Sequence, residues 1–190
     1  MGFVEELAKP WLSQIEPYEA YEPPPGVLEL DSNENFVVDE VWARSLLIKA
    51  ASSVDPRRYP PAYGKAAAEA ISEHLGLSVE EVSVSNGSDE LIDLAVKAFV
   101  QPGDEVVVVE PTFEVYGLVA RAAGARVVRV LVRPDFSLDP ARVVEAARRA
   151  KLVFLCSPNN PTGRQYELGE LRAVAEGCRC LVVVDEAYVG

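Results

Sequence analysis

Short, fully apolar runs alternate with stretches of helical periodicity from about residue 80 to the end of the chain. Such runs, bounded by turn residues, predict buried strands, and apolar positions three and four apart predict helices. The expected strands are Glu81–Ser85, Glu105–Val109, Arg126–Val132, Leu152–Cys156 and Leu181–Val184. The expected helices between them are Ser88–Phe99, Phe113–Ala122, Pro140–Ala150 and Glu167–Glu176. Because strands that are apolar throughout must be covered on both faces, the pattern predicts an α/β fold with a largely parallel sheet and helices on both of its faces.

The first 80 residues follow a different pattern. Helical spacing predicts one helix over 38–53 and another over 66–75, which ends at Gly76. Residues 1–35 contain proline-rich stretches such as Tyr21–Gly26 and little periodicity, which is typical of an extended arm lying on a surface. We therefore expect an N-terminal arm, residues 1–35, followed by one α/β domain, residues 36–190.

Composition and charge exclude several classes of protein. The 190 residues are 49% hydrophobic and 25% charged, as in ordinary globular domains. The net charge of −12 argues against a nucleic-acid partner, which requires a basic face. No apolar run approaches the roughly 20 residues that cross a bilayer, and a signal-peptide pattern is lacking, so we expect a cytoplasmic protein without a membrane partner. Three cysteines and a single histidine are too few to predict a disulfide framework or a metal site.

Four polar segments directly follow apolar strands. They are Asn86–Asp89, Pro111–Phe113, Ser157–Gly163 and Asp185–Tyr188. The carboxyl ends of parallel strands meet at one edge of a sheet, and ligands of such sheets bind outside that edge. The sequence therefore predicts a small-molecule site built from these segments.

Asp185 is the strongest single signal in this set. A carboxylate directly after a buried strand is desolvated unless a cation or a hydrogen-bond donor meets it. Tyr188, three residues later, can face the same ligand if the chain turns. The alternative interpretation is an Asp that only stabilises a turn at the end of a strand.

The other segments also leave two interpretations open. Asn86–Glu90 begins a helix, whose unpaired backbone N–H groups suit a phosphate, although Ser88 or Asp89 could cap those groups instead. The two adjacent amides in Ser157–Gly163 can present hydrogen bonds from a rigid loop, or can serve only a turn. Tyr59 and Tyr116 are aromatic candidates for a ligand, although ordinary half-buried packing explains an isolated tyrosine as well.

Six short strings occur in a fixed order along most of the chain: Ser32–Asn35, Arg58–Pro60, Asn86–Glu90, Pro111–Phe113 with Tyr116, Pro158–Gly163 and Asp185–Tyr188. Together they resemble the aspartate-aminotransferase superfamily of pyridoxal 5′-phosphate (PLP) enzymes of fold type I, most closely the histidinol-phosphate aminotransferase family. Each string alone is weak, but six in the right order are specific. The glycine-rich phosphate loops of nucleotide-binding domains do not occur.

The resemblance implies a role at the cofactor for each matching residue. Asp185 would pair with the pyridinium nitrogen of PLP and keep it protonated. Asn160 and Tyr188 would hydrogen-bond the phenolic oxygen of the ring, and Tyr116 would stack on its face. The phosphate would accept backbone N–H groups at the start of a helix, from Gly87, Ser88 and Asp89.

The resemblance also implies partners. Tyr59 is similar to the residue that reaches the cofactor phosphate of a neighbouring subunit, so a homodimer with shared sites is expected. Asn33 and Glu34 are expected near the entrance for the substrate. The implied substrates are a small amino-acid or amino-alcohol phosphate and a 2-oxo acid.

Members of the superfamily bind PLP through a Schiff-base lysine that follows the Asp-x-x-Tyr motif, and use a later arginine for the substrate carboxylate. The sequence ends two residues after Tyr188, so we expect an incomplete PLP-binding domain that lacks the catalytic lysine and is inactive alone. The expected reaction of the whole enzyme is amino transfer between histidinol phosphate and 2-oxoglutarate in histidine biosynthesis. Threonine-phosphate decarboxylase and aromatic aminotransferase remain alternatives, as does a fragment that acts with a second polypeptide.

Overall fold

The computed structural model describes residues 6–16, 24, 26–28 and 34–189. The chain divides into two compact units, one formed by Met1–Glu16 with Ser85–Gly190 and the other by Pro17–Val84. The sequence predicts a boundary between arm and domain at residue 35. That boundary differs from this division into two units and stays a prediction. Among the described residues, no helix is both long enough and apolar enough to cross a membrane.

A parallel four-stranded sheet forms the centre of the first unit. Its strands are β1 (Glu105–Glu110), β2 (Arg126–Leu131), β3 (Ala150–Cys156) and β4 (Leu181–Asp185). The helices are α4 (Ser88–Phe99), α5 (Val115–Ala122), α6 (Pro140–Ala146), the short 3₁₀ helix η4 (Ala147–Arg149) and α7 (Leu168–Gly177). The predicted α/β fold with a parallel sheet is confirmed, and α4 has the bounds expected from its apolar spacing.

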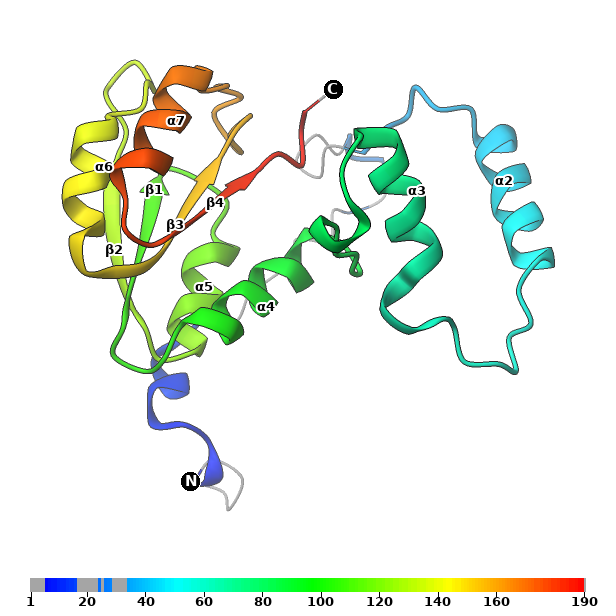
Figure 1. Ribbon diagram of the computed structural model, residues 1–190, viewed down its shortest axis with the longest axis horizontal. Helices are drawn as coiled ribbons and strands as arrows, with labels where there is room; N and C mark the ends of the chain where they lie inside the picture. The colour runs from blue at the N-terminus through cyan, green and yellow to red at the C-terminus, as the bar shows by residue number, and fades with distance from the viewer. Residues whose placement is uncertain (1–5, 17–23, 25, 29–33, 190) are drawn as a thin grey trace. The chain divides into compact units, whose positions relative to one another are not determined.

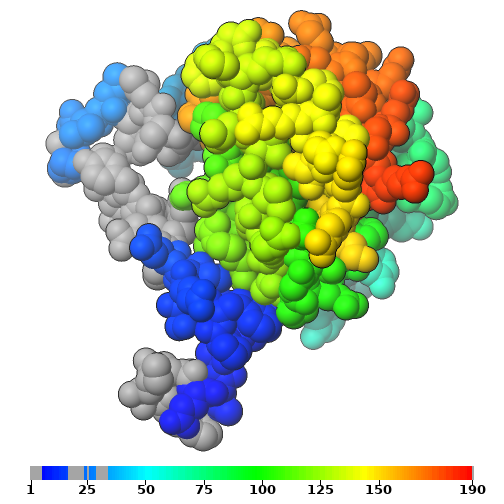
Figure 2. All heavy atoms as spheres, turned by 90° about the vertical axis from the view of Figure 1, so that its left-hand side faces the viewer, coloured from blue at the N-terminus to red at the C-terminus, as the bar shows by residue number. Residues whose placement is uncertain are grey.

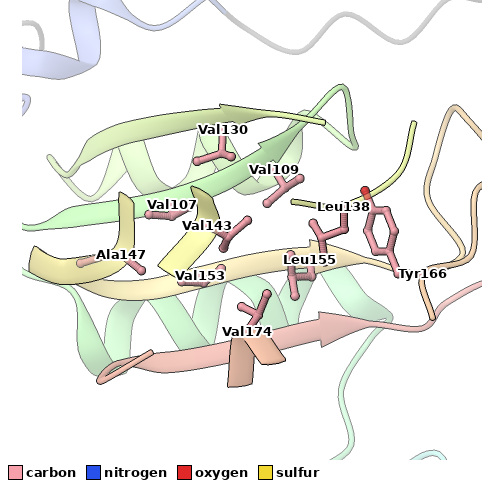
Figure 3. Close-up of a cluster of buried hydrophobic side chains, with 11 residues drawn as sticks. Val107, Val109, Val130, Leu138, Val143, Ala147, Val153, Leu155, Tyr166 and Val174 are labelled. Carbon is pink, nitrogen blue, oxygen red and sulfur yellow. The ribbon is translucent and has the colours of Figure 1, made fainter. Parts of the chain in front are cut away.

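Alternate residues of the central strands point to opposite faces of the sheet, and each face has its own core. Val107 and Val109 of β1 pack in one cluster with residues of α6 and α7 (Figure 3). Val106 and Val108 pack in the other cluster with residues of α4 and α5. The helices therefore cover both faces, as the uninterrupted apolar runs predict.

The order of the strands explains where a ligand can bind. The sheet has the order β2-β1-β3-β4, so the chain leaves β1 to one side and later returns to its other side. The loops after β1 and β3 consequently diverge, and in sheets of this kind ligands occupy the crevice between such loops.

The strand predicted over Glu81–Ser85 is wrong. Val79–Glu81 form a 3₁₀ helix, η3, which a reciprocal capping box of Ser78 and Glu81 stabilises. Residues 82–85 have no regular structure, and no other strand of the described chain pairs with them. A strand requires a hydrogen-bonded neighbour, which the apolar alternation in the sequence cannot supply by itself.

The end of the helix predicted over Pro140–Ala150 is also wrong. Helix α6 ends at Ala146, and Ala150 already belongs to β3, where it pairs with Glu105 of β1. Alanine has a high helix propensity, but pairing within the sheet overrides that local preference.

The second unit contains the two helices predicted before residue 80. They are α2 (Glu40–Ser52) and α3 (Lys65–Leu75). Asp39 caps α2 by accepting a hydrogen bond of 2.8 Å from the backbone N–H of Trp42. Helix α3 ends at Gly76, whose φ of 68° is the left-handed conformation typical of a helix C-terminus.

The segment before residue 17 contains a 3₁₀ helix, η1 (Pro10–Gln14), which packs on α5 in the first unit. Figure 2 shows this blue segment against the green part of the surface. The indole Nε1 of Trp11 donates a hydrogen bond of 3.0 Å to the backbone carbonyl of Ala122. The N-terminal segment is therefore fixed to the first unit by a specific contact.

Candidate functional site

A small pocket lies at the carboxyl edge of the sheet. Its lining residues are Ser88, Phe113, Tyr116, Cys156, Asn160, Asp185, Ala187 and Tyr188. They come from the start of α4, the segment after β1, the end of β3 with its following loop, and the end of β4. The structure thus brings together five of the predicted site residues, from four segments of the sequence. The described residues contain no cluster of three or more acidic, histidine or cysteine side chains that could hold a metal ion.

Asp185 is the last residue of β4, and both of its carboxylate oxygens accept a hydrogen bond. Oδ2 accepts from the hydroxyl of Tyr116 at 2.6 Å, and Oδ1 accepts from the backbone N–H of Ala187 at 3.0 Å. The second bond is the turn geometry considered as the alternative interpretation. Each carboxylate oxygen has two lone pairs, so Asp185 keeps capacity to accept a proton donor from the pocket. Turn stabilisation and ligand binding are therefore compatible at this residue.

Tyr116, on α5, is fully buried and supports Asp185 from inside the protein. Its ring stacks on Phe154 with a centroid distance of 4.9 Å, and Phe113 meets it edge-on at 5.7 Å. Burial, reinforced by the hydrogen bond to Asp185, raises the pKa of Tyr116 far above its ordinary value. The hydroxyl therefore remains a protonated donor at physiological pH.

These contacts bear on the predicted stacking role of Tyr116. One face of its ring is covered by Phe154, and its hydroxyl is engaged with Asp185. Phe113 also lines the pocket; its segment was predicted to belong to the site, but the residue itself was given no individual role. Its position directly after Pro111 and Thr112, in a loop at the end of a strand, is the signal that could have identified it.

The start of α4 offers backbone donors to the pocket. Gly87 precedes the helix with a φ of 82°, and no side chain of the described residues caps the first turn. Ser88 lines the pocket, whereas the side chain of Asp89 is exposed. Glu90 accepts a hydrogen bond from the backbone N–H of Asn86 instead. The capping interpretation for Ser88 and Asp89 is therefore wrong, and the N–H groups remain available to an anion.

The two adjacent amides after β3 have different surroundings. Asn160 lines the pocket, whereas Asn159 is 3% exposed and faces the protein. The Asn159 side chain accepts a hydrogen bond from the hydroxyl of Thr112 at 2.7 Å. It also donates to the backbone carbonyl of Pro111 at 2.9 Å and to the hydroxyl of Thr162 at 2.8 Å. Asn159 thus joins the loops after β1 and β3 where they diverge, a role that sequence reasoning missed.

The remaining predicted site residues belong to the second unit or lie outside the described residues. Tyr59 and Glu34 are exposed in the second unit, and Tyr59 is 100% exposed. Their roles near the cofactor stay predictions. Asn33 lies outside the described residues.

The sequence and the fold have counterparts among known proteins. Residues 25–190 match the family described as aminotransferase class I and II, and the chain therefore belongs to that family. It is 32% identical over 192 residues to the histidinol-phosphate aminotransferase of Clostridium kluyveri, covering 98% of this chain and 53% of that protein. It is 41% identical over 168 residues to the enzyme of the same name from Methanosarcina mazei, covering 87% and 45%.

A solved structure extends the comparison. The histidinol-phosphate aminotransferase of Sinorhizobium meliloti, determined in complex with pyridoxal 5′-phosphate, matches with a TM-score of 0.68 and 27% sequence identity. The match covers 75% of this chain and 40% of that one. The chain spans about half the length of the curated relatives it matches.

Proposed function

We propose that this chain provides the cofactor pocket of a PLP-dependent aminotransferase, and that the whole protein transfers an amino group between histidinol phosphate and 2-oxoglutarate in histidine biosynthesis. The observation that carries the proposal is the pocket in which Asp185, anchored by Tyr116, lies with Asn160, Tyr188 and the start of α4. The names of the relatives support the substrate.

The donors and acceptors of the pocket fit PLP. The remaining lone pairs of Asp185 suit the N–H of a pyridinium ring, and its negative charge keeps that proton in place. The uncapped N–H groups of Gly87, Ser88 and Asp89 suit the phosphate. Asn160 and Tyr188 carry hydrogen-bonding groups for the phenolic oxygen. When bound, PLP supplies the electron-withdrawing ring that amino transfer requires.

The residues of the chain hold and orient the reacting group. Tyr116 fixes the rotamer of Asp185, so the carboxylate does not need to reorganise when it meets a cation. Asn159 holds the loop that carries Asn160. Phe113 and Tyr116 give the pocket an aromatic wall that excludes water from one side.

We further propose that none of the five lysines in this chain anchors the cofactor covalently. Lys151 lies near the start of β3, about 17 Å from Cys156 at ~3.3 Å per residue. Lys97 lies near the end of α4, about 13 Å from Ser88 at ~1.5 Å per residue. In this proposal the anchoring lysine and the arginine for the substrate carboxylate belong to another part of the protein.

A homodimer is part of the proposal. A fully exposed tyrosine such as Tyr59 is available to a second copy of the chain, and the resemblance assigns it to the phosphate of the neighbouring site. A cytoplasmic location accompanies the biosynthetic role.

The test uses the whole protein with PLP, histidinol phosphate and 2-oxoglutarate, and measures the glutamate formed. We expect Asp185→Ala to retain PLP through its phosphate and to lose turnover by about 10²-fold or more, since an electrostatic partner of the reacting group is removed. Asp135→Ala, a control in an exposed turn, should retain both properties. Unchanged turnover in the Asp185 variant would contradict the assigned role, and absence of glutamate formation in the unaltered protein would contradict the substrate.

A further inference from the structure

A second pocket lies in the first unit, and none of the described residues that line it also lines the cofactor pocket. It measures about 360 Å³, and residues that line it include Trp11, Ile15, Arg121, Gly124, Val127 and Arg129. This volume is in the range of roughly 300–1,000 Å³ that small-molecule sites occupy. We call it the Trp11 pocket, and it lies between η1, the C-terminal end of α5 and β2.

The aromatic wall of the Trp11 pocket is held in place. Trp11 Nε1 donates to the carbonyl of Ala122, which fixes the plane of the indole. A side chain at Gly124 would place its Cβ 2.8 Å from the indole ring, so the ring fits there only because residue 124 is a glycine. The Lys9 ammonium lies 5.8 Å from the ring centroid, which adds a positive charge beside the indole.

Two guanidinium groups line the same pocket. The Arg121 side chain folds back along α5, where a Cβ on Gly117 would lie 3.1 Å from its Nη1. Among the described residues, Arg121 forms no ion pair. Arg129 lies 3.3 Å from Glu110, which neutralises one of the two guanidinium charges and leaves the other for a ligand. A net positive pocket on a chain of net charge −12 favours an anion.

We propose that the Trp11 pocket binds a small planar anion, a ring that carries a carboxylate or a phosphate. The ring packs on the indole of Trp11, and the oxyanion meets the fork of donors of Arg121. The packing on Trp11 requires the N-terminal segment to be docked on α5, so binding also stabilises that docking.

The test follows the fluorescence of Trp11 in the full chain. The sequence has two tryptophans, and Trp42→Phe on the exposed surface of α2 leaves Trp11 as the single reporter. The probes are phenyl phosphate and benzoate, which carry the two kinds of oxyanion, with phenol and benzamide as their neutral counterparts. We expect saturable quenching by at least one anion. Its neutral counterpart should bind with an affinity at least about tenfold lower.

Two variants and one control assign the binding to this pocket. Arg121→Gln should weaken the anion about tenfold and Arg129→Gln by less, because Glu110 neutralises the Arg129 guanidinium, whereas Arg142→Gln, which removes the same charge from α6 across the sheet, should have no effect. Equal affinity in the Arg121 variant and the unaltered protein would overturn the proposal. So would the absence of saturable quenching by either anion up to about 10 mM. The readout is independent of aminotransferase activity, so it can fail while the proposed function holds.

Discussion

The hydroxyl of Tyr116 donates a hydrogen bond of 2.6 Å to Oδ2 of Asp185, across 69 positions of the sequence. It joins α5, on one face of the sheet, to the carboxyl end of β4. Because burial keeps the phenol protonated, the donor is permanent, and the carboxylate has one fixed orientation. Tyr116 therefore belongs to the support of the pocket whether or not its ring also contacts a cofactor.

Removal of this hydroxyl tests the link between packing and the pocket. We expect Tyr116→Phe to retain the stacking on Phe154 and to lose about 1 kcal/mol of unfolding free energy with the hydrogen bond. The affinity for PLP should also fall, because Asp185 can then rotate. Thermal unfolding and a PLP titration measure the two effects.

The matched control is Tyr166→Phe. Tyr166 is also buried, but its hydroxyl makes no hydrogen bond within the described part of the chain. Its removal should change the unfolding free energy by less than about 0.5 kcal/mol and leave PLP affinity unchanged. Equal effects of the two substitutions would mean that the bond to Asp185 contributes nothing specific.

The parts of the fold that the sequence predicted well are those with uninterrupted periodicity. Helix α4 was predicted with its observed bounds because its apolar positions repeat at helical spacing, and its start after Gly87 has a clear signal. The apolar runs of β1 and β4 likewise define buried strands without knowledge of their neighbours. The edge at which the pocket lies follows from the parallel topology alone.

The errors arise where a residue's role depends on a partner distant in the sequence. Residues 82–85 have a strand-like pattern but no strand beside them in the described chain. Asn159 and Asn160 are the same residue type in adjacent positions, and contacts with Pro111 and Thr112, distant in the sequence, distinguish the buried one. The sequence likewise singled out Tyr116 as the aromatic residue of the site and gave no individual role to Phe113, although both line the pocket.

The two asparagines should therefore respond differently to the same substitution. Asn159→Ala removes three hydrogen bonds of a buried side chain and leaves the carbonyl of Pro111 and the hydroxyl of Thr112 without their partner in a partly buried site. We expect a loss of about 2–3 kcal/mol in unfolding free energy, measured by urea denaturation. Asn160→Ala should cost less than about 1 kcal/mol but should weaken PLP binding. The reverse order of stabilities would contradict the assignment of the two roles.

Cys180 gives the protein a pH-dependent stability above neutrality. Burial is the main cause that raises the pKa of this thiol from 9.0 to about 11, with a further contribution from the adjacent Cys178. In the folded state the thiol keeps its proton up to that pH, whereas the unfolded chain releases it above about pH 9. The stabilisation is therefore complete below pH 9 and is lost as the pH rises towards 11.

We expect the urea midpoint of the unaltered protein to fall between pH 8.5 and about 10.5 by more than that of Cys180→Ala. The variant lacks this titration but retains those of the tyrosines, so the difference between the two proteins reports the Cys180 thiol together with its effect on the neighbouring Cys178. Cys156→Ala is not suitable as a control for this measurement, because the Cys156 side chain lines the cofactor pocket. Parallel curves for the two proteins would contradict the raised pKa of the partly buried Cys180.

The docking of the N-terminal segment can be tested with two glycines that share one backbone conformation. Gly124 has a φ of 84° and Gly103 a φ of 90°, so alanine is strained at either position by about 1–2 kcal/mol. Only at Gly124 would the new Cβ lie 2.8 Å from the Trp11 ring, whereas at Gly103 it meets nothing within 4 Å. We expect Gly124→Ala to release Trp11 into water and Gly103→Ala to leave it in place. In the Trp42→Phe background, the emission maximum of Trp11 should shift to longer wavelength in Gly124→Ala alone. A shift of equal size in both variants would mean that backbone strain, and not the contact with the indole, governs the docking.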